Sequence, residues 1–200
     1  MTTFLLIRHG ETDAVGKILA GRKTGVRLNP SGKEQVERLA QTLSRLRIDA
    51  LYTSPLERAI ETAEAIGRRA LLMPAILADL NEVQFGDWEG LAFQELAAKE
   101  EWRRFNSDRR NFAPPGGESM REVQRRMAAQ LETLRLRHDG QTVVAVSHCD
   151  PLRALIAHWL GLPIECMLRF EVNPGSVTVA RAGSSSAQIV CLNRTEELGI

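Results

Sequence analysis

The sequence predicts an α/β sandwich with a mostly parallel sheet, and two observations lead to this fold class. Short apolar runs that are typical of buried strands, such as Thr3 to Ile7 and Gln141 to Val146, alternate with segments whose apolar residues repeat at helical spacing. The last two strand-like runs, Ser176 to Ala180 and Ala187 to Leu192, are separated by a Gly-Ser turn at 183–186, which is typical of a hairpin.

The length predicts one compact domain that spans residues 1–200. One stretch, Asp79 to Glu118, differs from the rest of the chain because it is polar, rich in charged residues and contains scattered aromatic residues. We expect this stretch to be an insertion over one end of the domain. Within it, the pattern predicts a helix from Phe93 to Phe105 and a loop from Asn106 to Glu118.

The first strand, Thr3 to Ile7, stops abruptly at Arg8-His9-Gly10, so a loop is expected there. Ser31 is the expected N-cap of the first helix, because Glu34 lies three residues on and completes a capping box. Ile48 to Tyr52 reads as the second strand. Each of these elements has an apolar face that a sandwich would bury.

The second helix is expected to start at Ser54, with Pro55 at its first position and Glu57 closing a capping box. We expect a short strand between Ala70 and Ala78.

The C-terminal half carries two more helix signals. Ser119 and Glu122 form a third capping box. Asp150-Pro151 is expected to open the next helix, which should stop near Gly161 and Pro163.

Charge and composition exclude several classes of protein. The 26 basic and 25 acidic residues leave a formal charge of +1, so we expect neither a nucleic acid nor a membrane surface as partner. No apolar run approaches the ~20 residues of a membrane span, and the first residues are too short an apolar stretch for a signal peptide. The three cysteines lack metal or disulfide spacing, which predicts a cytoplasmic protein. The oligomeric state is not fixed, and a homodimer is left open.

Three polar groups follow predicted strands: Arg8-His9-Gly10, Ser54 to Arg58, and Ser147-His148. In open α/β sheets, ligands bind beyond the carboxyl ends of the strands. Since the first and last groups both follow buried parallel strands, His9 and His148 should share one edge of the sheet.

Arg58 lies in the first turn of a predicted helix, where the helix dipole disfavours a cation by up to ~1 kcal/mol. An anion bound at that helix end would explain a cation there, because the anion would interact favourably with both the helix dipole and the guanidinium. Arg8 would supply a second guanidinium, and two arginines balance the ~1.5–2 negative charges of a phosphoryl group. The pattern therefore predicts a phosphate site.

A histidine in such a site suggests phosphoryl transfer. Neighbouring arginines and a second histidine should lower the pKa of His9 and keep its imidazole neutral and nucleophilic. An acid is needed to protonate the leaving oxygen, and the candidates are Glu82, Asp87 and Glu89. Spacing alone does not choose among them.

Four blocks of the chain, in order, resemble the signatures of the histidine phosphatase superfamily, in its phosphoglycerate-mutase-like branch. These blocks are Phe4 to Thr12, Thr53 to Ala63, Leu80 to Gly90, and Val146 to His148. The resemblance implies a three-layer α/β/α sandwich with one antiparallel edge strand and a short insertion over the active-site edge. It also implies that the enzyme uses neither a metal nor a cofactor.

The resemblance assigns roles to the candidate residues. It implies that His9 is the nucleophile that becomes phosphohistidine. It implies that Arg8, Arg58 and His148 bind and stabilise the phosphoryl group, and that Glu82 is the proton donor. The expected partner is a small phosphorylated substrate, and the expected activity is that of a phosphatase.

Two departures from the family pattern bear on the activity. Where many members have an aromatic residue and an asparagine after the first block, this chain has Ala14 and Val15. One polar contact to the phosphoryl group is therefore either missing or supplied by Thr12 or Arg22. The insertion is also shorter than in the mutases, and the spacing of its arginines does not match the mutase pattern. These arginines are Arg103, Arg104, Arg109 and Arg110.

Alternative readings remain open at this stage. A 2,3-bisphosphoglycerate-dependent phosphoglycerate mutase is the main alternative, and a non-catalytic module that binds phosphorylated ligands is a more remote one. A metal site of His9, His148 and Glu82 is disfavoured because two arginines nearby would repel a divalent cation. A Cys149 nucleophile is disfavoured because neighbouring residues of a strand point in opposite directions.

Overall fold

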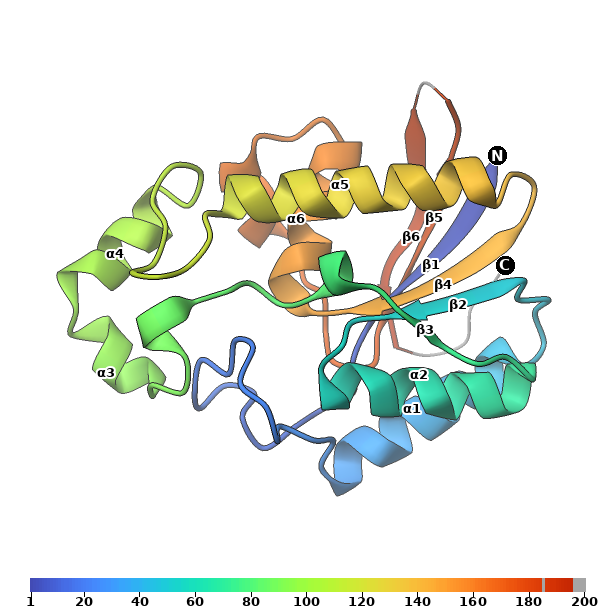
Figure 1. Ribbon diagram of the computed structural model, residues 1–200, viewed down its shortest axis with the longest axis horizontal. Coiled ribbons are helices and arrows are strands. Elements are labelled where there is room, and N and C mark those ends of the chain that lie inside the picture. The colour runs from blue at the N-terminus through green and yellow to red at the C-terminus, as the bar shows by residue number, and fades with distance from the viewer. Residues whose placement is uncertain (185, 196–200) are drawn as a thin grey trace.

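A six-stranded sheet lies at the centre of the computed structural model, which describes residues 1–184 and 186–195 (Figure 1). The strand order is β3-β2-β4-β1-β5-β6, and the first four of these strands are mutually parallel. The strands are β1 (Thr2–Arg8), β2 (Ala50–Thr53), β3 (Ala75–Ile76), β4 (Thr142–Ser147), β5 (Val177–Ala182) and β6 (Ala187–Arg194).

The antiparallel edge is the C-terminal hairpin. β5 pairs antiparallel with β1, and β6 pairs antiparallel with β5. The predicted mostly parallel sheet with an antiparallel edge is therefore confirmed. Ser185 of the predicted turn and residues 196–200 of the predicted domain lie outside the described residues.

Helices cover both faces of the sheet, as Figure 1 shows. α1 (Pro30–Leu43) and α2 (Glu57–Ala70) pack on one face, where they meet Leu5 and Ile7 of β1. α5 (Met120–Arg137) and α6 (Cys149–Trp159) pack on the other face, where they meet Phe4 and Leu6. Because successive side chains of a strand point to opposite faces of the sheet, β1 contributes to a hydrophobic core on each side. The predicted three-layer sandwich is confirmed.

The start of α1 differs from the prediction. The N-cap is Asn29, whose side chain accepts a hydrogen bond from the Gly32 amide at 2.7 Å, and Pro30 occupies the first turn. Ser31 instead donates its hydroxyl hydrogen to Glu11 at 3.1 Å. The predicted Ser31–Glu34 capping box is wrong because Asn followed by Pro is a stronger helix start two residues earlier.

The start of α2 also differs. The helix begins at Glu57 after Leu56, and no side chain caps it. Ser54 is not its N-cap because the Ser54 hydroxyl is bonded to His148 at 2.7 Å. By contrast, the capping box of Ser119 and Glu122 at the start of α5 is confirmed.

The segment between β3 and α5 lies beyond the carboxyl ends of the parallel strands, at the left of Figure 1. The predicted single helix from Phe93 to Phe105 is two helices, because the chain is extended at Lys99 and Glu100 opens a new first turn. This segment contains η1 (Ala78–Leu80), η2 (Gly86–Trp88), α3 (Phe93–Ala97) and α4 (Glu100–Ser107); a further short helix, η3 (Ile164–Arg169), follows α6.

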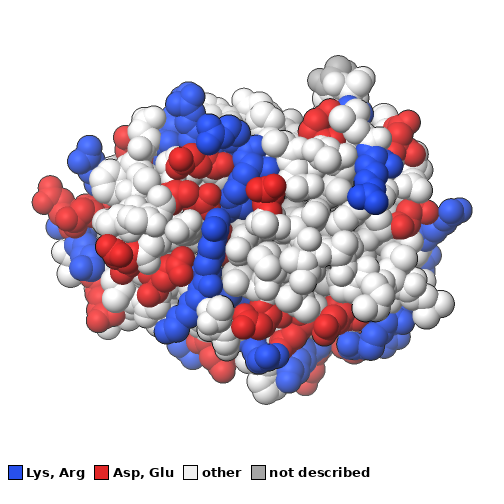
Figure 2. All heavy atoms as spheres, in the orientation of Figure 1, with Lys and Arg blue, Asp and Glu red and all other residues white. Residues whose placement is uncertain are grey.

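Acidic and basic side chains lie interspersed on the face shown in Figure 2, in agreement with the nearly balanced charge of the sequence. A narrow file of basic side chains runs between the insertion at the left and the helix-covered sheet at the right. Among the described residues, none of the helices combines the length and the apolar character that crossing a bilayer requires.

Candidate active site

The ends of three parallel strands bring the predicted polar groups together. In the ladder Arg8 lies beside Ser147 and Thr53 lies beside Val146, so the next residues along each strand start at the same edge. The His9 and His148 rings lie 5.0 Å apart between centroids. The prediction that both histidines share one edge is confirmed.

Gly10 explains how the loop after β1 reaches this position. A Cβ atom at Gly10 would lie 2.7 Å from the Gly32 carbonyl oxygen and 2.7 Å from a methyl of Val36. Only a glycine lets the loop pass this close to α1. The Gly10 amide donates to the Thr62 hydroxyl at 3.1 Å, which ties the loop to α2 as well.

A cavity of about 270 Å³ opens at this edge. Its charged end is lined by Arg8, His9, Arg58 and Glu82. These side chains come from strand ends, from the first turn of α2 and from the segment after η1. Arg22 does not line the cavity, and neither does His148, which is fully buried with its ring beside that of His9.

The His9 imidazole is held with its hydrogen on one nitrogen and a lone pair on the other. Its Nδ1 lies 2.7 Å from the Gly10 carbonyl oxygen, which can only accept, so the hydrogen is on Nδ1 and Nε2 carries a lone pair. Burial, followed by the charges of Arg58 and Arg8, holds the pKa of His9 well below its ordinary value. The ring is therefore neutral at pH 7.

The two arginines flank this nitrogen. Arg58 donates from Nε to His9 Nε2 at 3.3 Å and from Nη2 to the Gly21 carbonyl at 2.7 Å. Arg8 donates from Nη1 to the Val172 carbonyl at 2.7 Å. Arg58 is only 2% exposed, so this cation is buried without a carboxylate bonded to it among the described residues.

Several donors around His9 are buried and have no hydrogen-bond partner among the described residues. They are Arg8 Nε, Arg58 Nη1 and His148 Nδ1. A buried, unpaired N–H costs ~1–3 kcal/mol, and more when the group is charged. A ligand with several acceptor oxygens would remove this cost at three places at once.

His148 is oriented by Ser54. Its Nε2 lies 2.7 Å from the Ser54 hydroxyl, which also accepts from the Leu56 amide at 3.4 Å. The hydroxyl hydrogen can be donated to Nε2, and in that arrangement the hydrogen of the neutral His148 ring is on Nδ1. This Nδ1 lies 3.9 Å from a carboxylate oxygen of Glu82. Burial, followed by the charge of Arg58, lowers the pKa of His148 well below its ordinary value.

Glu82 has the properties of a proton donor at neutral pH. Its side chain is 13% exposed, and one carboxylate oxygen accepts from the Val83 amide at 2.9 Å. Burial and the neighbouring charge of Asp150 raise the pKa of Glu82 to about 7. Neither Asp87 nor Glu89 lines the cavity, so the geometry favours Glu82 among the three acids that spacing left open.

Arg22 does not line the cavity, contrary to its predicted contact with substrate. Its Nε donates to the Glu82 carbonyl at 2.8 Å, and its Nη2 pairs with Glu118 at 2.8 Å. Arg126 donates to the same Glu82 carbonyl at 3.2 Å and pairs with Glu118 at 2.9 Å. The Arg22 guanidinium is thus engaged in holding the backbone of Glu82.

The other predicted contact, Thr12, is buried and lines the cavity beside Ala14 and Val15. Cys149 also lines the cavity. Burial and the charge of Asp150 raise the pKa of the Cys149 thiol to about 12, so it is protonated at neutral pH and a weak nucleophile.

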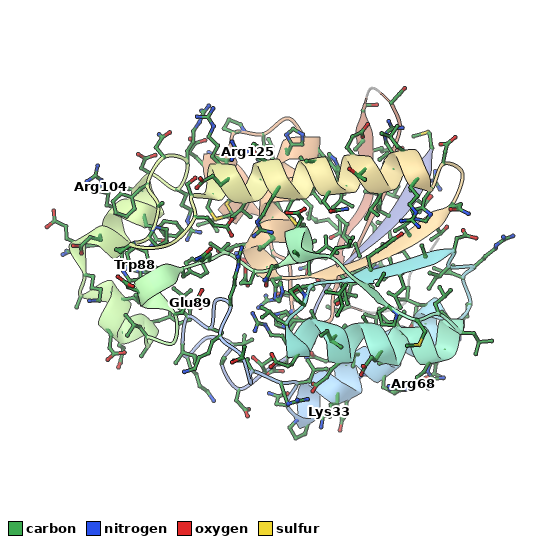
Figure 3. All side chains as sticks on the ribbon, in the orientation of Figure 1. Lys33, Arg68, Trp88, Glu89, Arg104 and Arg125 are labelled. Atoms are coloured by element: carbon green, nitrogen blue, oxygen red, sulfur yellow. The ribbon has the colours of Figure 1, made fainter. Side chains whose placement is uncertain are left out.

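The arginines of the insertion divide into two groups. Arg103, Arg104 and Arg110 are exposed, and Figure 3 shows Arg104 at the outer side of the insertion. Arg109 lies inward and lines the cavity, where it pairs with Asp150 at 3.4 Å. Within residues 1–184 and 186–195, no group of three or more His, Cys, Asp or Glu side chains is placed to hold a metal ion.

Residues 4–195 match the family model of the histidine phosphatase superfamily (branch 1). The chain belongs to the histidine phosphatase superfamily. The resemblance noted in the sequence is therefore confirmed across most of the chain.

Several relatives of this histidine phosphatase are phosphatases by name. It is 34% identical over 208 residues to phosphoserine phosphatase 1 of Hydrogenobacter thermophilus, covering 100% of this chain and 95% of the relative. It is 31% identical over 190 residues to adenosylcobalamin/alpha-ribazole phosphatase of Escherichia coli (strain K12), covering 94% of each. The crystal structure of phosphoserine phosphatase from Entamoeba histolytica in complex with 3-phosphoglyceric acid superposes with a TM-score of 0.88 at 28% identity, covering 98% of this chain and 99% of that one. The chain is thus an enzyme, a phosphatase of the histidine phosphatase superfamily.

Sequence reasoning did not anticipate the roles of Ser54 and Asp150 in this histidine phosphatase. Both residues fall at predicted helix starts, although Ser54 directly follows β2 and Asp150 lies two residues after His148. That position was the available signal. Glu118 and Arg126 had no such signal, because they come from a loop and a helix that only the fold brings next to Glu82.

Proposed function

We propose that this histidine phosphatase hydrolyses a small phosphorylated metabolite through a covalent phosphohistidine on His9, with Glu82 as the proton donor. The observation that carries the proposal is the group of buried, unpartnered donors on Arg8, Arg58 and His148 around a neutral His9. Such an arrangement fits the equatorial oxygens of a phosphoryl group in transfer. The phosphatase names of the relatives support the same reaction class.

In the first step, His9 Nε2 attacks phosphorus, an N–P bond forms and the P–O bond to the alcohol breaks. The leaving oxygen takes the proton of Glu82, which becomes a carboxylate. Arg8, Arg58 and the Nδ1–H of His148 donate to the phosphoryl oxygens, where negative charge is concentrated.

In the second step, water attacks phosphorus and the N–P bond breaks, which returns the His9 lone pair. The Glu82 carboxylate takes a proton from that water and is ready for another turnover. Arg22, Arg126 and Glu118 keep the Glu82 backbone in place during both steps, which makes them positioning residues.

The direct test is phosphate release from a panel of phosphorylated metabolites, with p-nitrophenyl phosphate as a reference and with and without EDTA. Release from at least one metabolite, undiminished by EDTA, is expected. Robust isomerisation of 3-phosphoglycerate in the presence of 2,3-bisphosphoglycerate, without phosphate release, would instead favour a mutase. No release from any ester would refute the proposal.

The pH dependence of turnover follows from Glu82. Since its pKa is raised to about 7, kcat/KM for an alkyl phosphate should fall about tenfold per pH unit above about pH 7, where the acid form is lost. His9 imposes no opposing limb near pH 7, because its pKa lies well below its ordinary value. Profiles of ethyl phosphate hydrolysis for the wild type and Glu82→Gln test this. The alkaline limb should vanish in the variant, and an unmoved limb would assign it to another group.

A further inference from the structure

The cavity has a second end whose chemistry is opposite to the phosphoryl site. This end is apolar and lies against the insertion and the loop after β1. The apolar side chains that line it include Ile18, Leu19, Phe85, Phe93, Trp102 and Phe105. A substrate whose phosphoryl group lies at His9 would therefore place its alcohol part against an apolar wall.

The aromatic residues of this wall support one another. Trp102 stacks on Phe105 at 5.8 Å between ring centroids, and Trp88 packs edge-on against both at 5.5 and 5.7 Å. Figure 3 shows Trp88 within the insertion, between α3 and α4. Phe85 and Phe105 are buried, whereas Phe93 and Trp102 are half-buried and keep ring surface for a ligand. Such a packed cluster holds its rings in place before a ligand binds.

The charges at this end are already committed within the protein. Arg109 pairs with Asp150 at 3.4 Å, donates to Asn106 at 2.6 Å, and lies 5.0 Å from the centre of the Phe105 ring. Its Nε is buried and has no hydrogen-bond partner among the described residues. Asp150 also lies 3.8 Å from Arg153. A carboxylate on the substrate would therefore have to compete with Asp150 for Arg109, and it would be repelled by the Asp150 carboxylate.

From this lining we infer that the preferred substrate is a phosphomonoester whose alcohol carries one uncharged aromatic ring. The cavity of about 270 Å³ is at the small end of ligand sites, which favours one ring system over a larger body. The inference rests on the proposed phosphatase function of the same site. It predicts weaker turnover of phosphorylated amino acids and phosphoglycerates.

The test compares phosphate esters of primary alcohols, so that leaving-group chemistry stays similar. Benzyl phosphate carries the ring, ethyl phosphate lacks it, and O-phosphoserine and 3-phosphoglycerate carry a carboxylate. We expect kcat/KM for benzyl phosphate to exceed that for each of the other three by at least about tenfold, the gain that burial of one ring supplies.

Variants test the wall itself through the ratio of kcat/KM for benzyl phosphate to that for ethyl phosphate. Phe93→Ala and Trp102→Leu should each lower this ratio about fivefold to tenfold. Phe112→Ala is the matched control, because Phe112 is a half-buried aromatic of the same segment that does not line the cavity, and it should leave the ratio unchanged.

Failure of the inference and failure of the proposed function give different results. A preference for O-phosphoserine or 3-phosphoglycerate, or a ratio unmoved by both wall variants, would overturn the aromatic assignment while phosphatase activity stands. If none of these esters nor p-nitrophenyl phosphate released phosphate, the proposed function would fail, and the assignment with it.

Discussion

Replacing His9 with alanine is expected to lower phosphate release by about 10⁴-fold or more, because loss of a covalent nucleophile removes the pathway itself. No neighbouring group can take its place. His148 is turned toward Ser54, and the raised pKa of Cys149 keeps that thiol protonated. The measurement is steady-state hydrolysis of p-nitrophenyl phosphate.

His158→Ala is the matched control, because His158 is exposed on α6 and lies outside the cavity. It should retain the wild-type rate. A His9→Ala enzyme that folds, as judged by circular dichroism, and turns over within tenfold of wild type would contradict the assigned nucleophile.

Replacing Glu82 with glutamine is expected to slow hydrolysis of alkyl phosphates by about 10²–10⁴-fold, because an amide cannot give a proton to the leaving oxygen. For p-nitrophenyl phosphate the effect on the first step should be much smaller, since nitrophenolate leaves without a proton. Single-turnover release of alcohol or nitrophenolate isolates that step from the attack of water.

Asp87→Asn serves as the control, because Asp87 was an equal candidate in the sequence but is exposed and does not line the cavity. It should leave both first-step rates unchanged. An equal loss for ethyl and p-nitrophenyl phosphate in Glu82→Gln would mean that Glu82 positions the substrate without donating the proton.

Much of the scaffold could be predicted from local patterns. The buried run of β1 and the polar residues that follow it determine where His9 lies, and the parallel pairing of β1 with β4 then places His148 beside it. Helix starts were less predictable, because Asn29 and Ser31 are both plausible caps in sequence. In the structure Asn29 caps the helix, ahead of Pro30, and Ser31 contacts Glu11.

The apolar end of the cavity could not be predicted from spacing. In the sequence, one continuous helix could contain Phe93, Trp102 and Phe105. In the structure the chain breaks at Lys99, and the rings of α3 and α4 then pack in one aromatic cluster. The position of the Arg22 side chain could not be predicted either, because its partner Glu118 is distant in sequence. Long-range contacts of this kind depend on the whole fold.

The central claim is that a phosphoryl group is carried on His9, and trapping it is the most direct test. The enzyme is mixed with p-nitrophenyl phosphate, quenched in alkali, where phosphohistidine survives, digested and examined by mass spectrometry. We expect one added phosphoryl group on the peptide that contains His9, lost after brief acid treatment and missing in His9→Ala. Rapid turnover with no phosphorylated peptide at any quench time, or with the phosphoryl group on another residue, would contradict the account.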